Sequence, residues 1–359
     1  DITAGAFATN SDGSVVVGSL ATGSSFIARV VASSEEGGEG GGGDGGGGGS
    51  GLITLEDVQQ SLAFSSGSAN MALTSAGTAI HGAHSRPLMR LVEPGENAFW
   101  LAGDWGRDDH GGRSGTIGLA EVGFGRNFGS AQINVSIGQT WARQDQTLGG
   151  EAKTSGTYVL AEALIPLGGT LWATLGGYAN RGKADLKRGY LNAGTPDISR
   201  GKPDLESWSL RARLDWLDVW RAGSTDFTPY IDLSHGKARL DAYTETGGGF
   251  PARFDKRTEK TTELRLGLNA AHPLSSGWKL HGTLEAAHRA QRKGARTSGE
   301  VVGLFGFDLD GVDNDRNWLR AGVGVEGKLA GGTASIMLNA TTKGEAASSW
   351  IALGWQRAF

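Results

Sequence analysis

Residues 208–216 read Trp208-Ser209-Leu210-Arg211-Ala212-Arg213-Leu214-Asp215-Trp216 and alternate strictly between apolar and polar side chains. Successive side chains of a β-strand point to opposite faces, so this segment predicts a strand with one apolar and one charged face. The same alternation returns in residues 262–270, 278–286 and 319–326. A half-buried sheet of a soluble protein can also alternate. A charged face repeated on many strands, with aromatic residues at strand ends, instead indicates a lumen inside and lipid outside.

The whole C-terminal part of the chain follows this pattern. We predict strands near residues 98–105, 114–125, 130–142, 153–166, 169–180, 205–217, 226–238, 258–271, 277–289, 316–328, 332–341 and 348–359. Alternate connections are short, whereas those near 181–204, 239–257 and 290–315 are long and polar. Short turns at one end and long loops at the other are typical of bacterial outer-membrane barrels with an even strand number. The sequence therefore predicts an all-β fold, a 12-stranded antiparallel transmembrane β-barrel.

The two faces of these strands predict two environments. We expect the apolar side chains to face lipid, among them Leu210, Leu214, Leu264, Leu266, Leu284 and Ile351. We expect the charged side chains to line a water-filled lumen, among them Arg211, Arg213, Glu263, Arg265 and Glu285.

A helix is predicted before the first strand, from Leu55 to about Ile80. Thr54 is a suitable N-cap, and acidic residues in the first turn favour the positive end of a helix. At 1.5 Å per residue the helix would be about 39 Å long, but its polar side chains exclude it from lipid. We expect an N-terminal α-helix running through the pore as a plug. The residues expected to hold it there are Thr54, Glu56, Asp57, Gln60 and Asn70.

Composition narrows the class of protein. The 359 residues include 61 glycines and no cysteine, and the net charge is −4. No run of about 18 apolar residues predicts a membrane-spanning helix, and the charge gives no sign of nucleic-acid binding. Residues 36–51 are nearly all glycine and predict a flexible tether. No leader pattern precedes Asp1, so we expect a mature or truncated product.

A glycine-rich tether, a pore-length helix and strands that end on Phe359 together resemble the translocator domain of autotransporters, the type V secretion family. The resemblance covers residues 52–359. The last strand resembles the assembly signal of outer-membrane barrels through Ile351, Leu353, Trp355 and Phe359, although Arg357 departs from its apolar pattern. Residues 10–18 resemble one HAF-type repeat, a short extracellular β module.

This resemblance implies four parts: a passenger remnant at 1–35, a linker at 36–51, the pore helix and barrel entry at 52–95, and the barrel at 96–359. It implies an outer-membrane translocator of a Gram-negative bacterium that exports its passenger to the cell surface and anchors it. No enzyme activity and no cofactor are implied. The implied partners are outer-membrane lipid and lipopolysaccharide, the barrel assembly machinery and the chain's own passenger, with no nucleic acid.

Two other functions stay open from the residues. A diffusion porin would use an aqueous path through a barrel of this size. A barrel hydrolase would use rim residues, for which Asp108, Asp109 and His110 are candidates.

Three smaller patterns also bear on chemistry. Asn70 suggests passenger self-cleavage inside the barrel, biased by inward Glu121 and Glu162, although relatives that cleave themselves carry an Asn-Asn pair. The acidic stretch Asp308, Asp310, Asp313 and Asp315 lacks the terminal bidentate glutamate of an EF-hand calcium loop. The close histidines His81 and His84 lack a third ligand for zinc, so we name no metal site.

Overall fold

Twelve antiparallel strands form a closed barrel in the computed structural model, which describes residues 18–19, 25–29, 51–54, 61–62, 67–82, 84–110, 114–192, 195–344 and 347–359. The barrel strands are β4 (Asn97–Arg107), β5 (Ser114–Asn127), β6 (Gln132–Asp145), β7 (Glu151–Gly168), β8 (Leu171–Asn192), β10 (Asp204–Trp216), β12 (Thr225–Leu240), β15 (Arg257–Pro273), β16 (Lys279–Arg289), β19 (Asn317–Leu329), β20 (Gly332–Thr341) and β21 (Ser349–Ala358).

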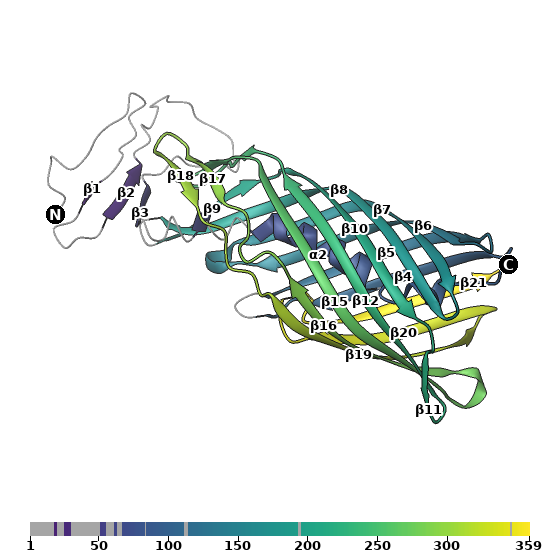
Figure 1. Ribbon diagram of the computed structural model, residues 1–359. Helices are drawn as coiled ribbons and strands as arrows, with labels where there is room; N and C mark the ends of the chain where they lie inside the picture. The colour runs from purple at the N-terminus through teal and green to yellow at the C-terminus, as the bar shows by residue number, and fades with distance from the viewer. Residues whose placement is uncertain are drawn as a thin grey trace.

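Each barrel strand pairs with its neighbours in sequence order, and β21 pairs with β4 to close the ring. Closure gives every spanning strand a backbone partner on both sides, which a hydrocarbon environment requires. Figure 1 shows helix α2 (Gly67–His81) inside the ring of strands. The predicted 12-stranded antiparallel barrel with a helix through its pore is confirmed.

The two faces of the wall follow the alternation in the sequence. Leu210, Leu264, Leu266 and Leu284 are exposed on the outer surface, and Leu214 and Ile351 are partly exposed there. The charged side chains between them are buried on the lumen side. They are Arg211, Arg213, Glu263, Arg265 and Glu285.

The three connections predicted to be long polar loops contain paired β-strands. Strand β8 continues to Asn192 and pairs with β9 (Thr195–Gly201). The other two connections contain β13 (Tyr243–Thr244), β14 (Ala252–Phe254), β17 (Thr297–Val301) and β18 (Phe305–Leu309), which form a four-stranded sheet. These segments are ordered because they have an apolar core of their own, in which Tyr190 packs with Phe250, Phe254 and Val301.

The opposite end of the barrel carries the short connections and the C-terminus (Figure 1). The longest of them contains β11 (Trp220–Ala222), a small hairpin arm against β12. The others include the 3₁₀ turn η3 (Ser275–Gly277). A second 3₁₀ turn, η2 (Thr147–Gly149), joins β6 and β7 at the long-loop end.

The N-terminal part is described only in short pieces. β1 (Gly18–Ser19), β2 (Ser25–Arg29) and β3 (Gly51–Thr54) form a small antiparallel sheet. Ser61 and Leu62 are helical, as is the backbone of Asn70. Glu56, Asp57 and Gln60 lie outside the described residues, as do residues 10–17 of the HAF-like stretch. Among the described residues, no helix is long and apolar enough to cross a membrane.

A charge on the lipid face tests this register. Leu266 is 54% exposed on the outer surface of β15. Leu266→Arg should lower the free energy of unfolding by about 2–4 kcal/mol, because an arginine near the bilayer midplane loses its hydration. Thr258→Arg, on the same face but at the end of the strand, should cost about 0–1 kcal/mol. Denaturant unfolding in lipid vesicles measures both, and equal costs would contradict the assigned faces.

Candidate functional site

The candidate site is the barrel lumen, which α2 occupies. The helix contacts the inner faces of β5, β6, β7, β8, β10, β12 and β15. Met71, Ala72 and Leu73 lie at its long-loop end and belong to a buried apolar cluster. The wall supplies Ile117, Ala142, Ala152, Ala184, Leu186, Leu205, Ala238 and Leu240 to that cluster. An apolar cluster therefore fills part of the lumen, which corrects the expectation of a water-filled lumen.

The middle of the helix packs against a second apolar group. Ala76, Ala79 and Ile80 lie against Leu119 and three further wall residues. These are Tyr158, Leu160 and Tyr178. Small helix residues let the backbone approach the wall closely, so a lumen of twelve strands holds one helix without a wide gap.

The C-terminal end of α2 is bound by wall arginines. Arg211 Nη1 donates to the carbonyl oxygens of Ile80 and His84, both at 3.0 Å. Arg320 Nη1 donates to His81 O, and Arg213 Nη1 donates to Ser85 O at 2.7 Å. The last carbonyls of a helix have no partner within it and carry its negative dipole end. The guanidinium groups satisfy both needs.

Buried carboxylates neutralise these arginines. Arg211 Nε lies 2.8 Å from Asp232 Oδ2, and Arg213 Nη2 lies 2.6 Å from Asp215 Oδ1. Farther along the wall, Arg265 binds two carboxylates, each at 2.7 Å. These are Glu263 and Glu285. Removing water from a charge costs several kcal/mol, so the lumen tolerates these ions because they are paired and hydrogen-bonded.

His84 joins the segment after the helix to two more strands. Its Nε2 lies 2.6 Å from Glu121 Oε1 on β5, and its Nδ1 lies 2.9 Å from Glu162 Oε2 on β7. The imidazole is 1% exposed. A histidine that bridges two carboxylates in this way fixes the position of the chain between α2 and β4.

Glu121 collects further donors. Trp100 Nε1 donates to it at 2.9 Å, the Tyr158 hydroxyl at 2.8 Å, and Ser136 Oγ at 3.1 Å. Arg90 Nη2 lies 3.4 Å from the same carboxylate. Residues on β4, β6 and β7 and in the 3₁₀ turn η1 (Pro87–Arg90) therefore meet at one side chain.

The chain leaves α2 through a close approach to the wall. A Cβ at Gly82 would lie 2.4 Å from Thr78 O and 2.6 Å from Asp104 Oδ1. The Gly82 amide donates to Thr78 O at 2.7 Å and ends the helical hydrogen bonding. Glycine is required here because a side chain would push the turn away from the wall arginines.

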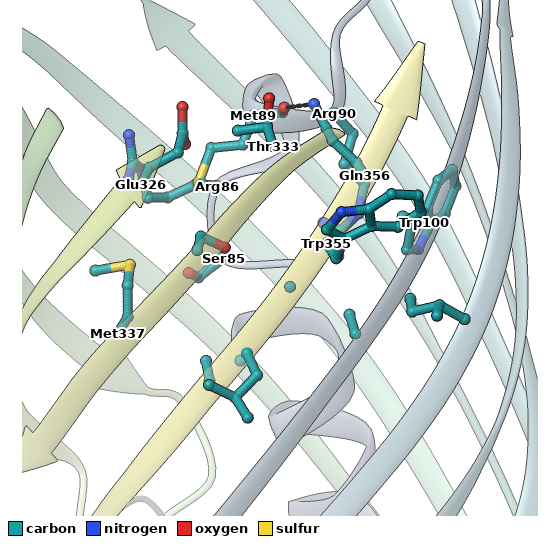
Figure 2. Close-up of a pocket in the computed structure, with 17 residues that line it drawn as sticks. Ser85, Arg86, Met89, Arg90, Trp100, Glu326, Thr333, Met337, Trp355 and Gln356 are labelled. Carbon is teal, nitrogen blue, oxygen red and sulfur yellow. Dashed lines mark hydrogen bonds between the residues drawn. The ribbon is translucent and has the colours of Figure 1, made fainter. Parts of the chain in front are cut away.

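A small cavity lies below this turn, between the segment that follows α2 and strands β4, β20 and β21. Figure 2 shows Arg86 and Glu326 on one side of it and Trp100 and Trp355 on the other. Gln356 Nε2 donates to Met89 O at 2.7 Å and ties the segment to the last strand. The cavity volume is about 60 Å³, room for about two water molecules and far too narrow for a polypeptide.

The other candidate residues do not assemble into a reactive site. Asp109 pairs with Arg107 at 2.9 Å, and His110 Nε2 lies 2.9 Å from Thr341 Oγ1. Asp308 binds Arg296 at 2.8 Å, and Asp315 lies 3.6 Å from Lys343. Within the described ranges, no group of three or more metal-ligating side chains could hold an ion.

The self-cleavage hypothesis fails on position. Asn70 lies in the first turn of α2, whereas Glu121 and Glu162 bind His84 beyond the last turn. At 1.5 Å per residue the two levels are about 20 Å apart. The two glutamates do face inward as the hypothesis required, but they hold the far end of the plug.

The roles of two lumen residues were not predicted from the sequence. The alternation in residues 319–326 places Arg320 on the charged, inward face, but it does not give its helix carbonyl partner. No sequence pattern predicts the partners of His84, because they are 37 and 78 residues away.

The role of Glu121 can be tested against a surface carboxylate. Glu121→Ala should lower the free energy of unfolding by about 3–5 kcal/mol, because His84 and Arg90 would lose a buried counter-charge. Glu206→Ala removes an acid that is 43% exposed and 3.4 Å from Arg181, and should cost less than about 1 kcal/mol. Urea unfolding of the refolded chain measures both. A small loss for Glu121→Ala would show that the lumen network is not coupled to folding.

Known structures are similar to this barrel. The translocator domain of the autotransporter NalP from Neisseria meningitidis superimposes with a TM-score of 0.66 at 16% identity, covering 82% of this chain and 99% of that one. The β-domain of the Bordetella autotransporter BrkA gives 0.51 at 15%, covering 74% and 99%. At these identities the likeness shows the fold.

The sequence itself identifies the family. No curated protein sequence matches the chain. The family model described as the autotransporter beta-domain matches residues 99–341, more than half of the chain and nearly all of the barrel wall. The chain therefore belongs to the autotransporter β-domain family, as a translocator barrel of the Gram-negative outer membrane.

Proposed function

We propose that this barrel supports export of the polypeptide N-terminal to α2 to the cell surface and then anchors it, with α2 left in the lumen as a plug. The observation that carries the proposal is the path of the chain. It enters the wall at β4 from the short-turn end, and α2 runs back through the lumen toward the long-loop end (Figure 1).

The chain before α2 is held at that long-loop end. Arg188 Nη1 donates to Ser61 Oγ at 3.1 Å, and the same guanidinium binds Glu245 at 2.6 Å. Leu62 is fully buried in the apolar core that includes Tyr190 and Phe250. A polypeptide with its C-terminal strands in the wall and its N-terminal part beyond the long-loop end is the arrangement expected after outward passage.

The last strand supports a proposal about insertion. Leu353 is exposed on the outer surface and Ile351 and Trp355 are partly exposed, while Phe359 is 60% exposed at the strand end. Such an apolar strand end, available before the ring closes, is a suitable recognition element for the barrel assembly machinery. The backbone edge of β21 remains open only until the strand pairs with β4.

A diffusion porin is less well supported by the same observations. A porin needs an aqueous path along the barrel axis. Here α2 occupies the lumen, and two apolar clusters pack it against the wall. The helix has no role in a porin, whereas a translocator leaves it behind as the end of the exported chain.

Export can be measured on intact cells. The full chain, given a secretion leader and an epitope tag before Asp1, should lose its tag to added protease while residues 97–359 resist. A variant lacking β21 cannot close the ring and should show no tag at the surface, which makes it the control. A tag that is protected in intact cells and cleaved only after permeabilisation would refute export.

The plug can be measured by conductance. Removing residues 52–84 should raise single-channel conductance in planar bilayers, because α2 occupies the lumen, and should lower the melting temperature through loss of the packing around it. Removing residues 36–51 spares the helix and should change neither quantity. An unchanged conductance after the first deletion would mean that α2 does not block the pore.

A further inference from the structure

An apolar groove lies on the outer surface of the barrel over β15, β16 and β19. Its volume is about 370 Å³. Its floor is Ala286, which lies directly opposite Leu266 on one side and Leu319 on the other. The two leucines are 54% and 52% exposed, so they form walls on either side of a methyl group. Such a furrow fits an extended hydrocarbon chain.

Polar groups close the groove at its long-loop end. His288 Nδ1 lies 2.7 Å from Asn317 Oδ1, and Arg316 Nη2 lies 3.3 Å from His288 Nε2. Arg316 Nε also donates to Arg289 O at 3.2 Å. If His288 donates from Nδ1, its Nε2 accepts from Arg316. The guanidinium is thus held at the end of the groove by Nε and Nη2, and the Arg316 residue as a whole is exposed.

A second pair of cationic side chains lies on the neighbouring strands β12 and β15. Lys237 on β12 and Lys260 on β15 are directly opposite each other, one row beyond the pair His235 and Thr262. Like charges in this position repel each other and destabilise a sheet. Trp208 lies directly opposite Lys237 on its other side, at the level where aromatic side chains border the lipid.

These cations differ from their neighbours in having no acid. Arg239 pairs with Asp241 at 2.8 Å, and Lys293 lies 3.4 Å from Asp310. Lys237, Lys260 and Arg316 form no ion pair with any residue that the structure describes. Unpaired cations near the long-loop end of an apolar groove complement an amphiphile with an anionic head.

The position of the groove selects the leaflet. It lies at the end of the barrel where the long connections and β17 and β18 are found, away from the C-terminus (Figure 1). That end faces outward in the proposed function, on which this step rests. The lipid of that leaflet is lipopolysaccharide, whose lipid A carries several acyl chains and two phosphates.

We propose that this surface is a binding site for lipid A. One acyl chain lies over Ala286 between Leu266 and Leu319. One phosphate binds Arg316, and the other binds Lys237 and Lys260, where it removes the repulsion between the two lysines. A bound lipid of this kind would bridge neighbouring wall strands next to the long connections.

Titration of the full refolded chain in detergent with fluorescent bisphosphorylated lipid A tests the site. Arg316→Gln and Lys260→Gln should each weaken binding about fivefold, as expected for one cation beside an anionic lipid head. Ala286→Phe should weaken it about tenfold, the equivalent of roughly two methylenes that no longer bury. Competition by monophosphoryl lipid A should be weaker than by bisphosphorylated lipid A.

Matched controls separate the site from general effects. Lys328→Gln removes an exposed cation at the opposite end, and Ala161→Phe fills an outward position on β7; both should bind lipid A as the unchanged chain does. Gel mobility before and after heating shows that each variant has folded. Unaltered affinity in Arg316→Gln and Ala286→Phe would overturn the proposal, as would equal competition by phosphatidylglycerol.

The lipid test does not depend on export. It uses purified protein, whereas export is read from protease access on intact cells. Binding with a failed export test would keep the site and refute the proposed orientation. Export with no effect of the groove variants on lipid A would refute the site alone.

Discussion

Closure of the backbone hydrogen bonds between β21 and β4 is the constraint on which the rest of the structure depends. An open sheet edge cannot persist in hydrocarbon, so the strands must form a ring. A ring of this size encloses a lumen that wall side chains alone do not fill. The lumen then needs either water or another element, and α2 occupies it.

The helix in turn depends on the wall. Its sequence Gly67 to His81 includes two glycines and several serines and threonines, which are weak helix formers. Its backbone is completed by guanidinium groups from β10 and β19, which bind the last carbonyls. An apolar cluster in the lumen buries Met71 and Leu73. Plug and wall therefore stabilise each other, since the wall arginines supply the last helix carbonyls with hydrogen-bond donors that the helix itself lacks.

Most of the wall could be predicted from the sequence because a strand has a period of two. The alternation around Trp208–Trp216 assigns Arg211 and Arg213 inward with no knowledge of their partners. The alternation tells which side chains face inward, but not whether an inward side chain is charged or apolar. Ile117 and Leu186 face inward and are apolar, because α2 presents apolar side chains to them. The ordered long connections were missed for a similar reason. Phe250 and Val301 lie far apart in sequence and form a core only after the chain has folded.

The site was the least predictable part because its partners are distant in sequence. His84 meets Glu121 and Glu162 only because closure brings β5 and β7 to the end of α2. The same geometry explains why wall arginines gather around the C-terminal end of the helix. The negative end of the helix lies there, and guanidinium groups stabilise it. Each buried cation then requires a carboxylate, which extends the network across the wall to Glu263 and Glu285. The polarity of one helix thus accounts for the arginines around its C-terminal end and for the carboxylates that neutralise them.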